Sequence, residues 1–228
     1  MESLEDYIIN HIDPEPEILR QINREAQVRL LHGHMSSGHH QGRLLKMLVQ
    51  MIRPCTILEI GTYTGYSALC IAEGIAEGIP GKASENHSET TNLQDQIVFE
   101  TIEIDDEMED IIRDNFTRSP HGKLIKLHIG DAHEIVPKYN DNYFDMVFMD
   151  GNKRNYWNLY EKLFSKIKSG GFILADNTLW HGKVVEKTKS NDWQTKGILE
   201  FNDNLSKDIR VEKVILPIRD GLTLIRKK

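Results

Sequence analysis

The sequence predicts an α/β fold: a doubly wound, mostly parallel sheet whose last two strands form an antiparallel hairpin. From residue 56 onward, short apolar segments alternate with segments of helical spacing, which is the rhythm of βαβ units. Several of the apolar segments are hydrophobic almost without interruption, as in parallel strands that helices cover on both faces. Near the end of the chain, the Asp220-Gly221 step between two strand-like segments favours a hairpin.

Seven segments have the length and composition of strands. They span residues 56–61, 97–104, 124–130, 144–150, 170–176, 211–218 and 222–227. Helical spacing of apolar residues fills most of the chain between them. These predicted helices span residues 66–78, 106–116, 131–139, 152–167 and 197–208. We therefore expect a seven-stranded sheet with helices in its connections.

Two further helices are expected before the first strand, in residues 15–33 and 39–52. The second pattern stops at Arg53, because a residue that precedes proline is disfavoured in a helix. We interpret residues 1–228 as a single domain, with N-terminal helices in 1–54 and the sheet-containing core in 55–228. The polar segment 81–95 is expected to be a surface insertion.

The composition is that of a soluble protein with an acidic balance. The 228 residues are 39% hydrophobic and 28% charged, with a formal net charge of -7. No apolar run approaches the roughly 18 residues of a membrane span, and the N-terminus lacks the basic and apolar regions of a cleaved signal. A cytoplasmic protein without a membrane anchor is expected. Extensive contact with nucleic acid, which needs clustered Lys and Arg, is disfavoured.

Asp150, Asp176 and Asn177 indicate a metal site. All three stand where an apolar, strand-like segment ends, so a parallel sheet could bring them to one rim. Carboxylate and amide oxygens suit a hard divalent cation, Mg²⁺ first, with Mn²⁺ or Ca²⁺ as alternatives. With three protein ligands, an octahedral ion keeps positions open for water or substrate. Chemistry on a bound molecule is therefore expected.

Three other strand ends suggest a pocket for an adenosine-containing cofactor. The turn from Gly61 to Gly65 lets a ligand approach the backbone closely. At the end of the second strand, Glu103 is placed to accept hydrogen bonds from ribose hydroxyls. After the third, Asp131 could accept from an exocyclic amine and the amide of Ala132 could donate to a ring nitrogen. Asp131 could equally cap the helix that follows.

With these motifs the sequence resembles the class I S-adenosylmethionine-dependent methyltransferases, and within them the metal-dependent catechol and caffeoyl-CoA O-methyltransferases. The motifs, from about residue 35 to the C-terminus, are ILEIGTYTGYSAL, TIEID, IGDA, FDMVFMDGNKRNY, ILADNTLWHGKVV and LPIRDGLTLIRK. The resemblance implies a Rossmann-like fold and a homodimer. It also implies methyl transfer from S-adenosylmethionine to a hydroxyl of a catechol-like or hydroxylated aromatic small molecule.

The resemblance also assigns roles to individual residues. Asp150, Asp176 and Asn177 match the metal ligands, and Lys153 matches the lysine proposed as general base, so Lys153 and Asp150 are the expected catalytic residues. His181 falls at a substrate-contacting position. The residues expected to contact S-adenosylmethionine are Ser37, Glu59, Gly61, Thr62, Tyr63, Ser67, Glu103, Asp131, Ala132, Asp150 and Asn152. The caffeoyl-CoA relatives carry acidic residues where this chain has Gln41 and Asn152.

Aromatic residues near the metal ligands have two interpretations. Trp180 and Trp193 flank a polar loop after Asn177, where stacking on a flat aromatic substrate and simple surface packing are equally consistent; Trp180 is counted here among the substrate residues. Tyr156, Trp157 and Tyr160 lie at helical spacing and are expected to be packing residues rather than an aromatic box.

Two other functions stay open on the sequence alone. One is an RNA methyltransferase that acts on a hydroxylated tRNA base, which a contiguous Lys and Arg surface would favour. The other is a binding protein that has kept the cofactor fold without catalysis. The histidines of residues 32–40 favour a loop beside the cofactor over a transition-metal site.

Overall fold

The computed structural model describes residues 3–78 and 97–228, so the predicted insertion at 81–95 lies outside the described residues. The chain divides into two compact units, each described here by itself. The first comprises Met1–Pro54, Thr62–Thr101 and Asp105–Leu127, and the second comprises Cys55–Gly61, Ile102–Ile104 and His128–Lys228. The interpretation of the chain as a single domain stays a prediction.

The first unit is mainly helical in its described part. Its helices are α1 (Leu4–Asn10), α2 (Glu17–Arg29), α3 (Gly38–Ile52), α4 (Tyr66–Gly78) and α5 (Glu109–Arg118). Helix α1 was not expected from apolar spacing, because it buries no residue. It is started by a capping box, in which the Ser3 hydroxyl accepts from the Asp6 amide and the Asp6 carboxylate accepts from the Ser3 amide.

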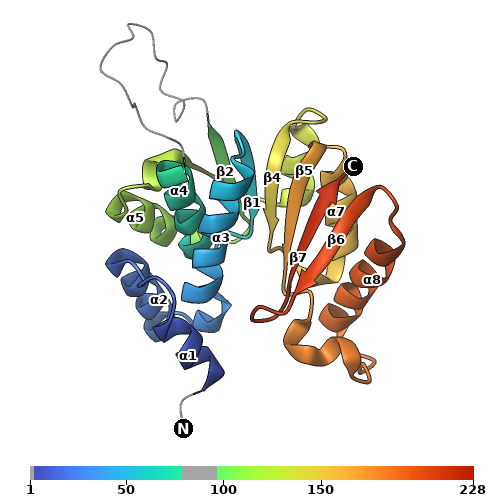
Figure 1. The fold of residues 1–228 in the computed structure, drawn as a ribbon, viewed down its shortest axis with the longest axis horizontal. Coiled ribbons are helices and arrows are strands. Elements are labelled where there is room, and N and C mark those ends of the chain that lie inside the picture. Colours follow the sequence, from blue (N-terminus) through green and yellow to red (C-terminus); the bar gives the residue numbers. More distant parts are fainter. Residues whose placement is uncertain (1–2, 79–96) are drawn as a thin grey trace, which may run out of the picture. The chain divides into compact units, whose positions relative to one another are not determined.

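Helices α3 and α4 pack side by side (Figure 1). A Cβ atom on Gly74 would lie 2.7 Å from the carbonyl oxygen of Lys46, so glycine is required for this close approach. The same interface buries the guanidinium of Arg43 against the carboxylate of Glu73, which also accepts from Lys46. Paired in this way, the charges can be held between two helices.

One sheet runs in the order β3-β2-β1-β4-β5-β7-β6. Strands β1, β4 and β5 are parallel, and β7 is antiparallel to both β5 and β6, between which it lies (Figure 1). This confirms the predicted α/β fold with a seven-stranded, mostly parallel sheet and a C-terminal antiparallel hairpin. The strands are β1 (Thr56–Ile60), β2 (Val98–Glu103), β3 (Ile125–Ile129), β4 (Phe144–Met149), β5 (Ile167–Asp176), β6 (Val211–Leu216) and β7 (Leu222–Lys227).

The core of the second unit forms where α7 (Tyr156–Phe164) and α8 (Trp193–Lys207) pack on its strands. Tyr156, Tyr160 and Phe201 are fully buried there, which confirms the packing role predicted for the two tyrosines. The remaining helix is α6 (Ala132–Ile135), and short 3₁₀ segments span Gly33–Met35, Asp106–Met108, Gly122–Leu124, Val136–Lys138, Lys153–Asn155 and Trp180–Val185.

Two predicted boundaries of the second unit were wrong. The helix expected over residues 152–167 ends at Phe164, because Ile167 already pairs with Phe144 in the sheet. The helix expected from residue 197 begins at Trp193, where the Asp192 side chain accepts from the Thr195 amide and caps it. In the parts of the chain that the structure covers, no helix combines the length and apolar character needed to cross a membrane.

Candidate active site

Two carboxylates meet at one edge of the second unit because β4 and β5 are parallel and in register. Met149 pairs with Ala175, so Asp150 and Asp176 come next on neighbouring strands. Asp176 is 3% exposed. Asn177 is the next residue and has a positive φ of 58°. Its backbone N–H donates to Oδ1 of Asp176 at 2.8 Å. The structure thus brings the predicted metal ligands to one edge.

Lys153 belongs to the same cluster. Its Nζ atom donates to Oδ1 of Asp150 at 2.6 Å and lies 4.7 Å from the centre of the Tyr156 ring. The residue is 5% exposed. Its position follows from the short 3₁₀ segment Lys153–Asn155, which the side chain of Asn152 caps by accepting from the Arg154 amide. A buried ammonium requires such a partner, since an unpaired one would lose its hydration.

The charges of this cluster act on Asp150. Burial raises the pKa of Asp150 to about 6. The positive charge of Lys153 lowers this pKa, and the negative charge of Asp176 raises it further. The positive charge of Arg219 has a smaller lowering effect. Two carboxylates that repel each other in a place of low polarity form a site for a cation. Within residues 3–78 and 97–228, no three His, Cys, Asp or Glu side chains form a metal-binding group. A metal here would therefore need the amide of Asn177 as its third protein ligand.

Tyr156 joins the two strand ends that carry these carboxylates. Its hydroxyl lies within hydrogen-bonding distance of the carbonyl oxygens of Met149 and Asp176, at 2.9 Å from the latter. Burial, followed by the charges of Asp150 and Asp176, raises the pKa of Tyr156 well above its ordinary value, so the hydroxyl keeps its proton to donate. The sequence predicted packing for this residue and missed its hydroxyl, because spacing alone does not reveal which carbonyl groups a side chain reaches.

The predicted substrate residues lie on the segment after Asn177. Trp180 and His181 both have left-handed backbone, with φ of 45° and 53°. The Trp180 ring packs against the core of the second unit, and its buried Nε1 atom has no hydrogen-bond partner among the residues that the structure describes. The Nδ1 atom of His181 lies 2.9 Å from Oδ1 of Asp220. By contrast, Trp193 is 58% exposed at the start of α8.

The strand ends predicted to hold the cofactor are joined by backbone hydrogen bonds. The Gly61 amide donates to Ile102 O at 2.9 Å and the Asp150 amide to Ile60 O at 2.8 Å. The Gly130 amide donates to Glu103 O at 2.7 Å. These bonds place the ends of β1, β2, β3 and β4 along one edge. Because ligands of open α/β sheets bind at such an edge, the predicted cofactor residues of the second unit have a common location.

The side chains along this edge suit a cofactor with hydroxyl and amine groups. Glu59 is fully buried and Glu103 is 7% exposed, and carboxylates this well hidden are suited to accept hydrogen bonds from a bound ligand. Asp131 caps α6 by accepting from the His133 amide at 2.7 Å, as one of its two interpretations predicted. Ala132 is buried, whereas Asn152 is exposed.

Four predicted cofactor residues belong to the first unit. Ser37, at the start of α3, is 5% exposed and makes no side-chain cap, while Ser67 is 6% exposed on α4. The hydroxyls of Thr62 and Thr101 are 2.6 Å apart. Tyr63 has a φ of 51° in the turn that follows Thr62. Since the first unit is described by itself, their joint action with the residues of the second unit stays a prediction.

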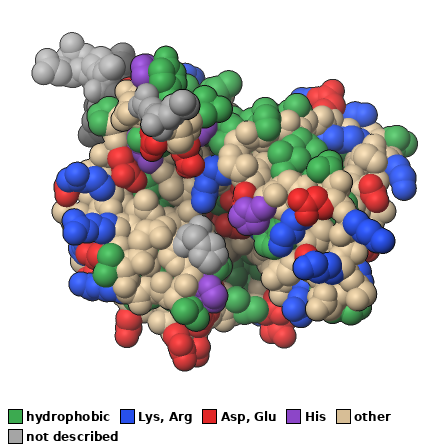
Figure 2. Space-filling model, turned by 90° about the horizontal axis from the view of Figure 1, so that it is seen from below, with side chains coloured by type: hydrophobic (Ala, Val, Ile, Leu, Met, Phe, Trp, Pro, Cys, Tyr) green, Lys and Arg blue, Asp and Glu red, His purple; other side chains and the backbone are tan. Residues whose placement is uncertain are grey.

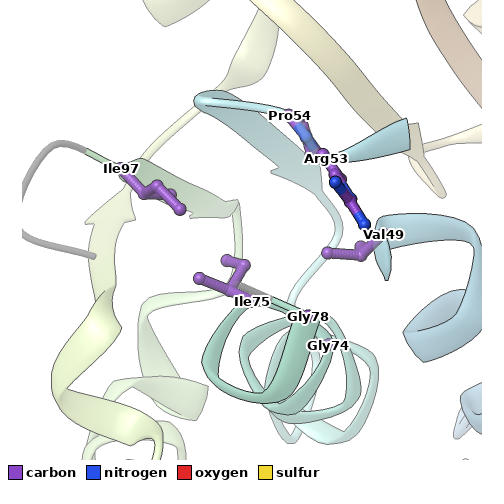
Figure 3. Close-up of a pocket in the computed structure, with 7 residues that line it drawn as sticks. All are labelled: Val49, Arg53, Pro54, Gly74, Ile75, Gly78 and Ile97. Atoms are coloured by element: carbon purple, nitrogen blue, oxygen red, sulfur yellow. The ribbon is translucent and has the colours of Figure 1, made fainter. Parts of the chain in front are cut away.

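A small hollow in the first unit contains none of the predicted site residues. It has a volume of about 10 Å³ and lies beside α3 and α4, where Val49 and Ile75 line it together with glycines (Figure 3). This is room for about one water molecule, so the hollow is too small to hold a cofactor or an aromatic substrate. Among the described residues on the face seen in Figure 2, Lys and Arg are interspersed with Asp and Glu rather than gathered in one basic surface.

Comparisons with known proteins agree with this geometry. A family model described as O-methyltransferase matches residues 10–228. The caffeoyl-CoA O-methyltransferase 2 of Populus trichocarpa is 31% identical over 218 residues, which cover 93% of this chain and 83% of that protein. The Bacillus cereus O-methyltransferase solved in complex with SAH has a TM-score of 0.80 at 25% identity, covering 99% of this chain and 97% of that one.

A Podospora anserina methyltransferase solved with SAH bound shares the fold, with a TM-score of 0.82 at 24% identity over 99% of this chain and 94% of its own. Fold and site edge together define the class, an S-adenosylmethionine-dependent methyltransferase of Rossmann-like fold. The chain belongs to the O-methyltransferase family, as an S-adenosylmethionine-dependent enzyme of the caffeoyl-CoA O-methyltransferase type. An enzyme is thereby confirmed over a non-catalytic binding protein.

Proposed function

We propose that this enzyme methylates a hydroxyl of a catechol-like aromatic small molecule and that it does so with a divalent cation. The observation that carries the proposal is the meeting of Asp150 and Asp176 at the ends of adjacent parallel strands, with Lys153 2.6 Å from Asp150. A transferase that only had to bind an adenosine cofactor would have no need to hold two repelling carboxylates in a buried place.

The donor set fits a hard cation. Asp150, Asp176 and the side-chain amide of Asn177 would hold it, with Mg²⁺ as first choice because all three donors are oxygens. Such a cation supplies Lewis-acid chemistry: it lowers the pKa of a hydroxyl bound to it and orients the molecule that carries the hydroxyl. A catechol would suit such a cation, because it offers two neighbouring hydroxyl oxygens as ligands.

We propose that Nζ of Lys153 accepts the proton of the reacting hydroxyl. The amine is buried and held beside Asp150, a proposed metal ligand, and this position supports the assignment. In its neutral form the amine takes that proton, and in its charged form it stabilises the phenolate; proton transfer by a positioned group contributes about 10²- to 10⁴-fold to a rate.

The transfer itself needs alignment more than further chemistry. The acceptor oxygen forms a bond to the methyl carbon while the carbon–sulfur bond breaks, which yields a methyl ether and S-adenosylhomocysteine. Glu59 and Glu103 are assigned to the cofactor's hydroxyl and amine groups, with Ser37, Thr62, Tyr63, Ser67, Asp131, Ala132 and Asn152. Trp180 and His181 are assigned to the acceptor. Holding the acceptor oxygen, the methyl carbon and the sulfur in line lowers the activation free energy by an amount on the order of 7 to 11 kcal/mol.

The test uses purified protein, labelled S-adenosylmethionine and catechol, with Mg²⁺ or with excess EDTA. We expect methyl transfer with Mg²⁺ and a loss of at least about 100-fold with EDTA. Asp150→Asn and Asp176→Asn should abolish both turnover and Mn²⁺ binding measured by calorimetry. Asp203→Asn, on the exposed face of α8, is the matched control and should change neither.

Two results would overturn the proposal. Equal rates with Mg²⁺ and with EDTA would rule out a role for the cation. Methylation of bulk tRNA that carries the hydroxylated base and lacks its methyl group, with no methylation of catechol, would favour the RNA alternative instead. A homodimer and a cytoplasmic location rest on the sequence and its resemblance and stay predictions; sedimentation of the purified protein tests the first.

A further inference from the structure

Helix α8 packs against the chain just beyond the two strands that lead to the proposed metal ligands. It contacts the short segment Lys153–Asn155, which follows β4, and the segment Trp180–Val185, which follows β5. Asp150 stands before the first of these segments, and Asp176 and Asn177 stand before the second. One helix therefore lies against both parts of the chain that lead away from the proposed metal site.

Gly197 of α8 brings the helix into close contact with the first segment. A Cβ atom at this position would overlap the carbonyl oxygen of Lys153 and would lie 2.9 Å from Cα of Arg154. Glycine in the interior of a helix is destabilising relative to alanine, so the packing against Lys153, and not the helix itself, explains a glycine here. The backbone of Lys153 is thus held by α8, while its Nζ atom donates to Asp150 at 2.6 Å.

Asn202 of the same helix binds the second segment close to its start. Its Nδ2 atom donates to the carbonyl oxygen of Thr178 at 2.8 Å. Its Oδ1 atom is buried and has no hydrogen-bond partner in the part of the chain that the structure describes. An unpaired buried oxygen is unfavourable, and leucine would occupy a similar volume without one. What an amide at this position contributes is therefore the bond to Thr178.

Thr178 is the residue after the proposed metal ligand Asn177, and each of its polar groups is engaged. Its backbone amide donates to Gly221 O at 3.0 Å, and its hydroxyl lies 2.8 Å from the hydroxyl of Thr223. Its carbonyl oxygen accepts from Asn202, and the residue is fully buried. Asn177, with its φ of 58°, is thus fixed on one side by β5 and on the other by Thr178.

We propose that α8 positions two groups of the site relative to each other: Gly197 fixes the proton acceptor Lys153, and Asn202 fixes the metal ligand Asn177 through Thr178. The inference rests on the proposed function, whose base and cation it connects through one helix. Gly197 and Asn202 are positioning residues, because each acts through another residue. A proton is transferred only within hydrogen-bonding reach, so a shift of either group relative to the other lowers the rate.

The experiment uses two variants that should fail in different ways. Asn202→Leu releases the carbonyl group of Thr178 and should weaken Mn²⁺ binding, measured by calorimetry, by about 10- to 100-fold. Its kcat for catechol at saturating metal should stay near normal. Gly197→Ala displaces the backbone of Lys153 and should lower kcat at saturating metal by about 100-fold, without weakening the binding of Mn²⁺ or SAH.

Each variant has a matched control. Asn204→Leu makes the same change at a half-buried asparagine of α8 and should keep Mn²⁺ affinity. Gly74→Ala overpacks α4 in the first unit, where a Cβ atom would lie 2.7 Å from Lys46 O, and should lower stability but keep kcat. Thermal unfolding of the four variants is measured in parallel, so that a loss of stability is separated from a loss of position.

The inference is overturned if Asn202→Leu binds Mn²⁺ as tightly as the wild type or no more weakly than Asn204→Leu. It is also overturned if a folded Gly197→Ala enzyme has the same kcat as Gly74→Ala. If Gly197→Ala does not fold, the Mn²⁺ affinity of Asn202→Leu decides by itself. A wild type that neither binds Mn²⁺ nor methylates catechol would refute the proposed function, whereas an active, metal-binding wild type with unaffected variants would refute the role of α8 alone.

Discussion

Nζ of Lys153 lies 2.6 Å from Oδ1 of Asp150, so the proposed proton acceptor and a proposed metal ligand share one ion pair. We expect Lys153→Met to lower kcat by about 10²- to 10⁴-fold with little change in SAH affinity, as measured by steady-state kinetics and calorimetry. The neighbouring Arg154 is exposed, so Arg154→Gln is the control and should keep near-normal kcat. A Lys153→Met enzyme with a kcat within twofold of the wild type would contradict the assignment.

Metal binding should depend on pH through Asp150. Burial raises the pKa of this carboxyl to about 6, so below that pH it holds a proton and cannot serve as an anionic ligand. Mn²⁺ affinity should therefore be constant above about pH 7 and fall about tenfold per unit below about pH 6. Calorimetric titrations across this range check it. An affinity that stays level down to about pH 5 would show that Asp150 is not the group involved.

Tyr156→Phe should disturb the ends of β4 and β5, which carry the proposed metal ligands Asp150 and Asp176. The variant loses the hydroxyl shared by the carbonyl oxygens of Met149 and Asp176, at a cost of about 1 to 3 kcal/mol in the free energy of unfolding. Mn²⁺ affinity should fall as well, because these carbonyl groups stand at the ends of β4 and β5.

Tyr160→Phe is the matched control for that variant. It removes a buried hydroxyl that donates to Asp208 at 2.8 Å, so its cost in unfolding free energy should be similar. Its Mn²⁺ affinity should stay normal, since Asp208 is not one of the proposed metal ligands. Parallel urea unfolding and metal titration of the two variants would separate stability from site geometry, and equal loss of affinity in both would refute the role of Tyr156.

Gly61→Ala should damage the cofactor edge. A Cβ atom there would lie 2.3 Å from Asp150 O, and the φ of 93° is itself unfavourable for alanine. We expect a loss of about 3 kcal/mol or more in unfolding free energy, from backbone strain and overpacking together, with weaker SAH binding. Gly182→Ala has a similar φ of 77° but meets nothing within 4 Å, so it should lose about 1 to 2 kcal/mol and keep SAH affinity.

Acid should weaken the fold through Asp208. Hydrogen bonds from Arg210 lower the pKa of Asp208 to about 2, against the opposing effect of burial, while its unfolded value is about 3.9. Stability from this group is therefore present above about pH 4 and is lost as the pH falls toward about 2. Asp208→Asn should lower unfolding free energy by about 2 kcal/mol at pH 7.

The difference between the wild type and Asp208→Asn should narrow below about pH 4, as seen in urea unfolding at several pH values. The exposed Asp203 on α8 provides the control, because Asp203→Asn should leave unfolding free energy nearly unchanged at every pH. A difference that is the same at pH 7 and at about pH 3 would mean that the contribution of Asp208 does not depend on its charge.

The elements of the fold could be predicted from the sequence because the signals that make them are local. Apolar runs such as residues 144–149 and helical spacing such as that of α4 depend on neighbours a few positions away. Helix α1 escaped prediction because its signal is a polar capping box with no buried face. The start of β5 was missed because Ile167 pairs with Phe144, a contact that helical spacing cannot reveal.

The site was predicted in part for the same reason. Asp150, Asp176 and Asn177 stand at recognisable strand ends, and a parallel sheet has one edge where strands end. The roles of Tyr156 and Asp220 were missed, because they act on groups 20 and 39 positions away in the chain. The sequence correctly predicts that Asp220 belongs to a turn. It cannot show the contact of Asp220 with His181, because this contact forms only when the hairpin packs against the segment after Asn177.

By itself, the sequence determined which segments become strands and helices and that oxygen donors stand where the strands end. The tertiary structure decided that β7 lies between β5 and β6. It also decided the register of β4 and β5, which puts Asp150 beside Asp176 at the ends of adjacent strands. The physical reason is that backbone hydrogen bonds between strands are the same for every partner, so the order of a sheet is chosen by the packing of whole faces and not by local spacing.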